Sequence, residues 1–221
     1  TRTVGVVPTR GAVPVLGTNP LAFAAPAGRN RAFRLDMATS TTAANKVKVY
    51  DLRGKPLPEG WVLDGAGQAV TDAARAWDII KNQPMGGLTP VGGTPDMASH
   101  KGYGLGLMVH ILGGALSGAS FSPIRVRTQR PEDPDNLGHF FMAIDPKAFR
   151  EDGAFEADLD EVVDVLHATP PADPALPVLV PGDPEAESRE TRLREGIPVP
   201  ESLQARIRDV CLRSNAEYLL G

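Results

Sequence analysis

A glycine-rich stretch around Lys101 holds the residue types best suited to binding chemistry. Lys101 stands where a helix would begin, Gly102, Gly104 and Gly106 follow it, and the run from 107 to 119 is almost wholly apolar. Each glycine costs a helix about 1 kcal/mol relative to alanine, so we expect close backbone packing or a ligand to offset the loss. A cation at a helix N-terminus opposes the helix dipole. We therefore interpret Lys101 as a ligand for an anion, with an ordinary exposed lysine as the alternative.

A second candidate is the hydroxyl-rich segment 39–42, which enters a predicted helix over 43–50. Hydroxyls at a helix N-terminus accept backbone N–H bonds and cap the helix. The same N–H groups can bind phosphate, so a capped helix and a phosphate site both remain open. Asp36 lies at the end of the preceding strand, where it could bind a sugar hydroxyl or cap the turn.

The histidines and the single cysteine give no metal or catalytic assignment. His100, His110, His139 and His167 show no metal-ligand spacing, and Cys211 has no partner for a disulfide or a thiolate cluster. We interpret His110 and His139 as structural. No catalytic residue and no metal ligand are assigned.

Composition limits the classes of partner. The 221 residues are 42% hydrophobic and carry a net charge of −4, which argues against nucleic acid and against an anionic membrane surface. The run from 102 to 121 approaches membrane-spanning length, but it contains six glycines and His110, so we predict a buried helix of a soluble protein. No signal peptide is visible, and we expect a cytoplasmic location.

Periodicity and turn residues predict the elements that position these candidates. The glycines at 102, 104 and 106 do not match GxGxxG and follow no predicted strand, which argues against a Rossmann fold. We expect an exposed segment over 125–136, a loop over 60–67 and irregular chain over 86–97. The predicted strands are 21–26, 33–38, 138–146 and 178–180, and the further predicted helices are 72–82, 155–167, 187–195 and 202–212.

Seven segments, in order, resemble the malate/L-lactate dehydrogenase family that is distinct from the Rossmann-type lactate and malate dehydrogenases. They spread over almost the whole chain. They are Leu16–Pro20, Leu35–Ser40, Pro56–Trp61, His100–Leu105, Gly138–Phe141, Pro181–Glu185 and Arg194–Pro198.

The resemblance implies an α/β fold of the non-Rossmann type, with a largely antiparallel sheet flanked by helices. It divides the chain into a cofactor-binding domain, 1–146, and a C-terminal helical region, 147–221, that completes the cofactor site and returns to the body of the enzyme. It also implies a homodimer, and NAD or NADP as cofactor. The matching cofactor-binding residues are Asp36, Met37, Ala38, Thr39, Ser40, Ala44, Asn45, Lys46, Lys101, Gly102, Pro181, Gly182, Asp183, Pro184 and Glu185.

The implied function is an NAD(P)-dependent oxidoreductase, or its cofactor-binding portion, acting on a small 2-hydroxy or 2-oxo acid such as malate or lactate. Family members carry an upstream region with the proton-donating histidine and a substrate-binding arginine, and this sequence contains neither motif. We therefore expect a separate N-terminal segment as a partner, or a catalytically incomplete nicotinamide-binding or assembly module. A plain interaction protein is the third alternative. If the cofactor is NADP, Lys46, Lys48 or Arg53 could meet its 2′-phosphate.

Overall fold

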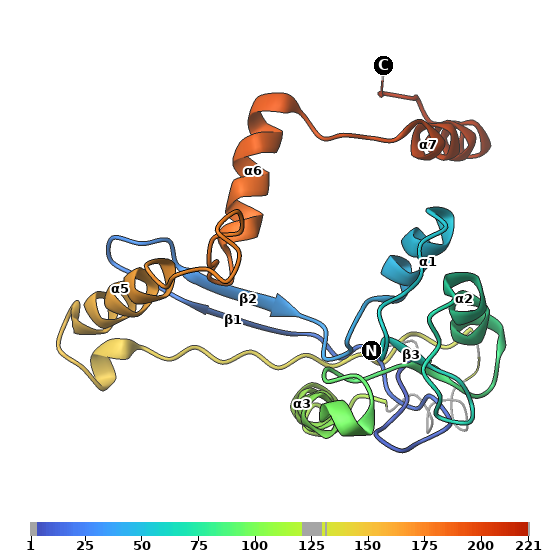
Figure 1. The fold of residues 1–221 in the computed structure, drawn as a ribbon, viewed down its shortest axis with the longest axis horizontal. Coiled ribbons are helices and arrows are strands. Elements are labelled where there is room, and N and C mark those ends of the chain that lie inside the picture. Colours follow the sequence, from blue (N-terminus) through green and yellow to red (C-terminus); the bar gives the residue numbers. More distant parts are fainter. Residues whose placement is uncertain (1–3, 121–129, 131, 221) are drawn as a thin grey trace. The chain divides into compact units, whose positions relative to one another are not determined.

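The computed structural model describes residues 4–120, 130 and 132–220 (Figure 1). The chain divides into two compact units. The first comprises Thr1–Ala25 and Arg34–Phe155, and the second comprises Pro26–Phe33 and Glu156–Gly221. Each unit is described by itself below.

The first unit contains two small sheets. The strands β1 (Leu21–Ala25) and β2 (Phe33–Met37) form one pair, close to the predicted bounds. The strands β3 (Val62–Leu63) and β4 (Gly87–Leu88) form an antiparallel pair in stretches predicted as loop and irregular chain. The described residues thus combine helices with small sheets and antiparallel pairing, which agrees in part with the predicted α/β fold, although the strands form two small sheets. Two-residue strands carry no alternating pattern that a sequence could reveal.

The helices of the first unit pack around a small apolar core. The helix α1 (Ala44–Leu52) contacts α2 (Ala73–Asn82), and Val47, Val62 and Leu88 are almost fully buried between these elements and the second sheet. The N-terminus of α2 is capped by Asp72, whose carboxylate accepts the N–H of Arg75 at 2.7 Å. This helix matches its prediction because both its cap and its apolar face are local signals.

The glycine-rich stretch forms α3 (His100–His110), which continues as a π-helix, η2 (Ile111–Ala115). A short 3₁₀ turn, η1 (Pro95–Met97), precedes it. The prediction of a buried helix is wrong, because only the glycines 102 and 106 of α3 are buried, whereas Met108, Ile111 and Leu116 are exposed. No helix in the described residues has the length and apolar character needed to cross a membrane.

Residues 138–146 do not form the predicted strand. They are extended, but they pair with no described strand and lead into a 3₁₀ turn, η3 (Pro146–Ala148). The apolar pattern was correctly identified, but strand formation also needs a neighbour with which to pair. Most of the predicted exposed segment 125–136 lies outside the described residues, and residues 132 and 134–136 are exposed.

The second unit consists mainly of three helices, α5 (Ala154–His167), α6 (Asp183–Glu195) and α7 (Glu201–Ser214). The predictions of α5 and α7 agree with the structure to within two residues. Helix α6 starts four residues before its predicted start, because the turn at 181–185 is its first turn. The predicted strand 178–180 is wrong, since these residues have no pairing partner in the described chain.

Candidate functional site

The start of α3 packs directly on the chain segment that follows β4. The N–H of Gly102 donates to the carbonyl oxygen of Val91 at 3.1 Å. A Cβ at position 102 would overlap the backbone of Val91 and would lie 2.7 Å from its Cα. At Gly104, by contrast, a Cβ would meet nothing within 4 Å. Close backbone packing therefore explains Gly102 and does not explain Gly104.

The same segment holds the hydroxyl-rich residues against α3. The Val91 N–H donates to the carbonyl oxygen of Thr39 at 2.9 Å, and the buried Thr39 hydroxyl lies 3.1 Å from the carbonyl oxygens of Thr18 and Asn19. A Cβ on Gly106 would lie 3.1 Å from that hydroxyl. The structure thus brings together two of the predicted cofactor-binding segments, 36–40 and 101–102.

The N-terminus of α1 is open. Its N-cap residue is Ala43, and no side chain caps the helix. The hydroxyl of Ser40 donates to the carbonyl oxygen of Thr42 at 2.9 Å, and that of Thr41 donates to Pro90 at 2.6 Å. The interpretation of these hydroxyls as helix caps is therefore wrong, since their hydrogen bonds stabilise the turn before the helix.

Thr42 carries a hydroxyl that has no hydrogen-bond partner. The residue is 6% exposed, and its Oγ1 is buried without a partner in the described chain. Leaving a buried hydroxyl unpaired costs about 1–3 kcal/mol. Such a group therefore either destabilises the fold or forms its hydrogen bond with a ligand. Its place, two residues before the first residue of α1, puts it beside the uncapped first turn.

The other predicted residues of the first unit are mostly accessible. Met37, Ala38 and Ala44 are half-buried, whereas Asp36, Asn45 and Lys101 are exposed and their side chains bind no other described residue. The ammonium of Lys46 lies 5.1 Å from the centre of the Trp61 ring, a cation–π contact.

The cations considered for a 2′-phosphate differ in availability. The Lys48 ammonium lies 2.7 Å from a carboxylate oxygen of Asp51 and 5.4 Å from the Trp77 ring centre, so its charge is already paired. Arg53 is exposed at the C-terminal end of α1.

The turn 181–185 lies in the second unit and forms the start of α6. Gly182 has φ of 109°, in the left-handed region that favours glycine. The Asp183 carboxylate accepts the Val180 N–H at 2.8 Å and lies 2.8 Å from Nε2 of His167. Burial raises the pKa of Asp183, but these two hydrogen bonds and the charges of His167 and Arg31 together outweigh it, and the pKa is lowered overall.

Acidic residues fill the first turn of α6, where Asp183 and Glu185 face the positive end of the helix dipole. Pro184 and Glu185 are exposed. This end of the helix is already satisfied by negative charge, so it is poorly suited to a phosphate. It suits a neutral hydroxyl-bearing group that donates to carboxylates.

A cavity of about 270 Å³ opens beside this turn, entirely within the second unit. It is bounded by the loop between β1 and β2, by α5 and by the chain before α6. The lining residues are Arg29, Asn30, Arg31, Ala32, Phe33, Val163, His167, Val180, Pro181 and Asp183. Of these, the sequence had indicated only Pro181 and Asp183 as site residues. The loop residues carried a turn signal but no sign that they meet residues more than 130 positions away.

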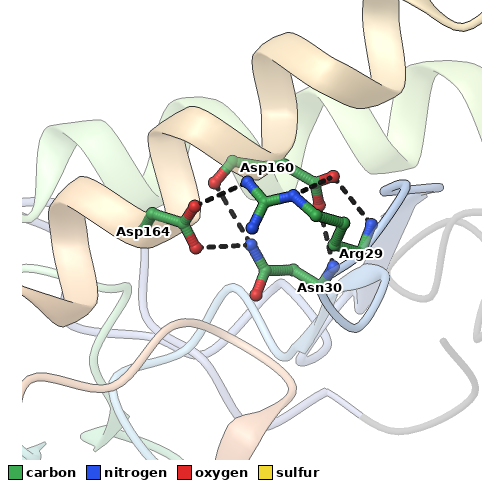
Figure 2. Close-up of polar contacts among 4 residues, drawn as sticks. All are labelled: Arg29, Asn30, Asp160 and Asp164. Atoms are coloured by element: carbon green, nitrogen blue, oxygen red, sulfur yellow. Dashed lines mark hydrogen bonds and ion pairs between the residues drawn. The ribbon is translucent and has the colours of Figure 1, made fainter.

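Asp160 of α5 holds that loop in place (Figure 2). Its carboxylate accepts the backbone N–H groups of Arg29 at 2.7 Å and Asn30 at 2.8 Å. One turn further along α5, Asp164 accepts hydrogen bonds from the side chains of the same two residues, each at 2.8 Å. The Asn30 N–H lowers the pKa of Asp160; burial opposes it, and the Arg29 N–H lowers the pKa further. Asp160 is only 3% exposed, so its charge is stabilised by these donors rather than by water.

The sequence model of the malate/L-lactate dehydrogenase family matches residues 1–208. The chain belongs to the malate/L-lactate dehydrogenase family.

Curated members of the family resemble the chain over almost its whole length. A malate dehydrogenase from Pyrococcus horikoshii is 34% identical over 215 residues, which are 97% of this chain and 57% of the relative. A delta(1)-pyrroline-2-carboxylate reductase from Ancylobacter novellus is 33% identical over 91% of this chain and 54% of its own length. This family member therefore spans little more than half the length of these relatives.

Solved structures of related dehydrogenases also match the chain over almost its whole length. The malate dehydrogenase of Entamoeba histolytica is similar with a TM-score of 0.86 and 26% identity, over 98% of this chain and 60% of that one. The sulfolactate dehydrogenase of Methanocaldococcus jannaschii is similar with a TM-score of 0.77 and 29% identity, over 97% and 58%.

Proposed function

We propose that this chain is the cofactor-binding portion of an NAD(P)-dependent oxidoreductase that acts on a small 2-hydroxy or 2-oxo acid such as malate or lactate. The observation that carries the proposal is the family match over residues 1–208. When bound, the nicotinamide exchanges a hydride with the carbon that bears the hydroxyl or oxo group. Each unit, taken by itself, contains residues suited to a part of that cofactor.

The first unit is suited to the cofactor's phosphates. The first turn of α1 has no side-chain cap, and uncapped N–H groups at a helix N-terminus bind phosphate oxygens. The buried Thr42 hydroxyl beside it binds no described residue, so its O–H is available to donate to a phosphate oxygen. Lys101 is exposed, and no described residue pairs with its charge. The donor set is chemically matched to a pyrophosphate, with Asn45 and Lys46 in the same turn.

The second unit is suited to the adenosine end. Its cavity of about 270 Å³ is lined by Asp183, whose carboxylate can accept hydrogen bonds from sugar hydroxyls, and by Phe33 and Pro181, which are suited to contact with a flat base. Because Asp183 is held by His167 and the Val180 N–H, its oxygens are fixed before any ligand arrives. A preorganised acceptor loses little entropy on binding.

The charges around this cavity favour NAD over NADP in the proposal. Arg29 is paired with Asp160 and Asp164, and Arg31 is paired with Glu190. With Asp183 of the lining, four carboxylates thus stand against two guanidinium groups, and among the described residues around the cavity the guanidinium groups are already paired. A phosphate here would meet net negative charge, which costs binding energy.

The proton that must reach the substrate oxygen has no assigned donor. General acid catalysis needs a group within hydrogen-bond reach of that oxygen, and the chain spans 57% of the Pyrococcus horikoshii relative. This favours a second candidate function: a nicotinamide-binding or assembly module that does not turn over alone. The homodimer implied by the family stays a prediction for either function.

Two measurements on the purified chain test these proposals. Quenching of Trp61 and Trp77 fluorescence by NADH and NADPH reports binding, and loss of NADH absorbance with a panel of 2-oxo acids reports turnover. Binding with turnover supports the oxidoreductase, and binding without turnover supports the module. A folded chain that binds neither nucleotide contradicts both.

A further inference from the structure

Arg31 lines the cavity of the second unit and forms an ion pair with Glu190 of α6. The two residues are 159 positions apart, and Nη2 of Arg31 donates to Oε1 of Glu190. Their side chains are 56% and 61% exposed. Because water screens an exposed pair of this kind, it adds little to stability, and a change at Glu190 should leave the fold intact.

The charge of Arg31 also acts on the main hydrogen-bond acceptor of the cavity, Asp183. Although burial raises the pKa of that carboxyl, the Arg31 guanidinium is one of the charges that help to lower it. The Val180 N–H and Nε2 of His167 both contact the same oxygen of Asp183, Oδ2. The other oxygen, Oδ1, has no partner in the part of the chain that the structure describes. A ligand that donates to Oδ1 would therefore lie within range of the Arg31 charge.

Arg29 is the other guanidinium that lines the cavity, and it is held by two carboxylates (Figure 2). Its Nη2 lies 2.8 Å from Asp164, and its Nε lies 3.6 Å from the buried Asp160. Arg31, by contrast, pairs with Glu190 alone among the described residues. A single substitution can therefore release Arg31, whereas it cannot release Arg29.

The presence of a phosphate on the ribose 2′-oxygen distinguishes NADP from NAD. A guanidinium binds a phosphate through two parallel N–H donors. When a carboxylate already occupies one of those donors, fewer remain for the phosphate. The negative charge of the carboxylate also repels a phosphate placed beside it. Pairing of Arg31 with Glu190 thus weakens the cavity as a site for a 2′-phosphate in two ways.

We propose that Glu190 sets the preference of this cavity for NAD, because it occupies the guanidinium of Arg31 and so excludes a 2′-phosphate. This inference rests on the proposal that the cavity holds the adenosine end of the cofactor. The cavity without the Glu190 charge has one free guanidinium and accepts the adenosine end of NADP.

The test uses two probes that carry only the adenosine end, adenosine 5′-monophosphate and adenosine 2′,5′-bisphosphate. Titration calorimetry measures their binding to the full chain. In Glu190→Ala, affinity for the bisphosphate should rise on the order of tenfold, and affinity for the monophosphate should change by less than about twofold. Alanine is preferred to glutamine, because a glutamine amide oxygen could still accept the Arg31 N–H.

Two further variants identify the groups responsible. Glu187→Ala is the matched control, because Glu187 is an exposed residue of the same helix that pairs with no described residue. It should leave both affinities unchanged. The double variant Glu190→Ala/Arg31→Ala should lose the gain in affinity for the bisphosphate.

Four outcomes would overturn the inference. If Glu190→Ala binds the monophosphate normally but gains nothing for the bisphosphate, Glu190 does not set the preference, and the proposed function stands. An equal gain in Glu187→Ala would assign the effect to the net charge of α6. A gain that persists in the double variant would assign the phosphate to a cation other than Arg31. If neither probe binds to the folded chain or to Glu190→Ala, the adenosine end lies elsewhere; binding of NADH then still tests the proposed function by itself.

Discussion

Gly102 and Val91 lie in backbone contact. The N–H of Gly102 donates to the Val91 carbonyl oxygen at 3.1 Å, and this contact fixes the start of α3 on the segment that also binds Thr39. The exposed Lys101 is the adjacent residue, so the position of its ammonium group depends on this contact.

Gly102→Ala and Gly104→Ala should change stability in opposite directions. At 102 the new Cβ overlaps the Val91 backbone, and overpacking of this kind costs about 1–3 kcal/mol. At 104 the space is open, and replacing a helical glycine by alanine should gain up to about 1 kcal/mol. Urea unfolding of both variants measures the two effects. Equal destabilisation would show that the α3 glycines are required for another reason.

Thr42→Val should separate binding from stability. The valine has nearly the shape of threonine and removes a buried hydroxyl without a partner, so the free energy of unfolding should stay the same or rise by about 1 kcal/mol. Affinity for NADH should fall if the hydroxyl meets a phosphate. Titration calorimetry and urea unfolding give the two readouts.

Thr89→Val is the control for that experiment. The Thr89 hydroxyl is fully buried and donates to the Gly60 carbonyl oxygen at 2.5 Å. Its loss leaves that acceptor unpaired and should cost about 1–3 kcal/mol. If Thr42→Val destabilises the chain as much as Thr89→Val, its hydroxyl has a structural role.

Lys101→Ala should weaken nucleotide binding about ten- to a hundredfold, because a charge-assisted hydrogen bond contributes about 1.5–3 kcal/mol. The fold should be unaffected, since the Lys101 side chain contacts no described residue through a polar bond. Lys55→Ala removes an equally exposed charge from the same unit and should leave the affinity unchanged. An equal loss in both variants would indicate only a general charge effect.

Acid should release the loop that Asp160 holds. The pKa of Asp160 is lowered in the folded chain, so its contribution to stability is full above the unfolded pKa of about 3.9 and is lost as the pH falls through the folded pKa. The protection of the Arg29 and Asn30 amides, measured against the exchange of an unfolded chain at the same pH, should therefore fall below about pH 4.

The Asp160→Asn variant isolates this effect. It should expose the Arg29 and Asn30 amides at neutral pH and flatten the acid dependence. Glu161→Gln, on the exposed side of the same helix, should behave like the unaltered chain. Retention of the full acid dependence in Asp160→Asn would assign it to another carboxylate.

Local signals in the sequence were sufficient for β1, β2, α1, α2, α5 and α7. The cap at Asp72 and the apolar spacing of α5 are contained within a dozen residues. The strand predicted over 138–146 failed because pairing depends on a neighbour that a local pattern does not specify. The burial predicted for α3 failed for a related reason: the apolar side chains are present, but no described element covers Met108 or Leu116.

Contacts among the candidate site residues were predictable to a similar extent, and the role of these residues in binding stays a prediction. The segments around Thr39 and Lys101 were identified by residue type, and the structure joins them through Val91. The contribution of Arg29 to the second unit's cavity was not predictable, because its partner Asp160 is 131 positions away. At the start of α1 the sequence left a capped helix and a phosphate site both open, because a run of hydroxyls before a helix normally indicates a cap, and the structure shows no side-chain cap there.

The division of the second unit between residues 26–33 and 156–221 has a consequence for how the protein is made. Closing a flexible loop of the length that separates Arg29 from Asp160 costs about 4 kcal/mol beyond a constant. During synthesis, the loop residues leave the ribosome well before α5 exists to bind them. The first unit can therefore begin folding cotranslationally, whereas the cavity of the second unit must form among the last events of folding.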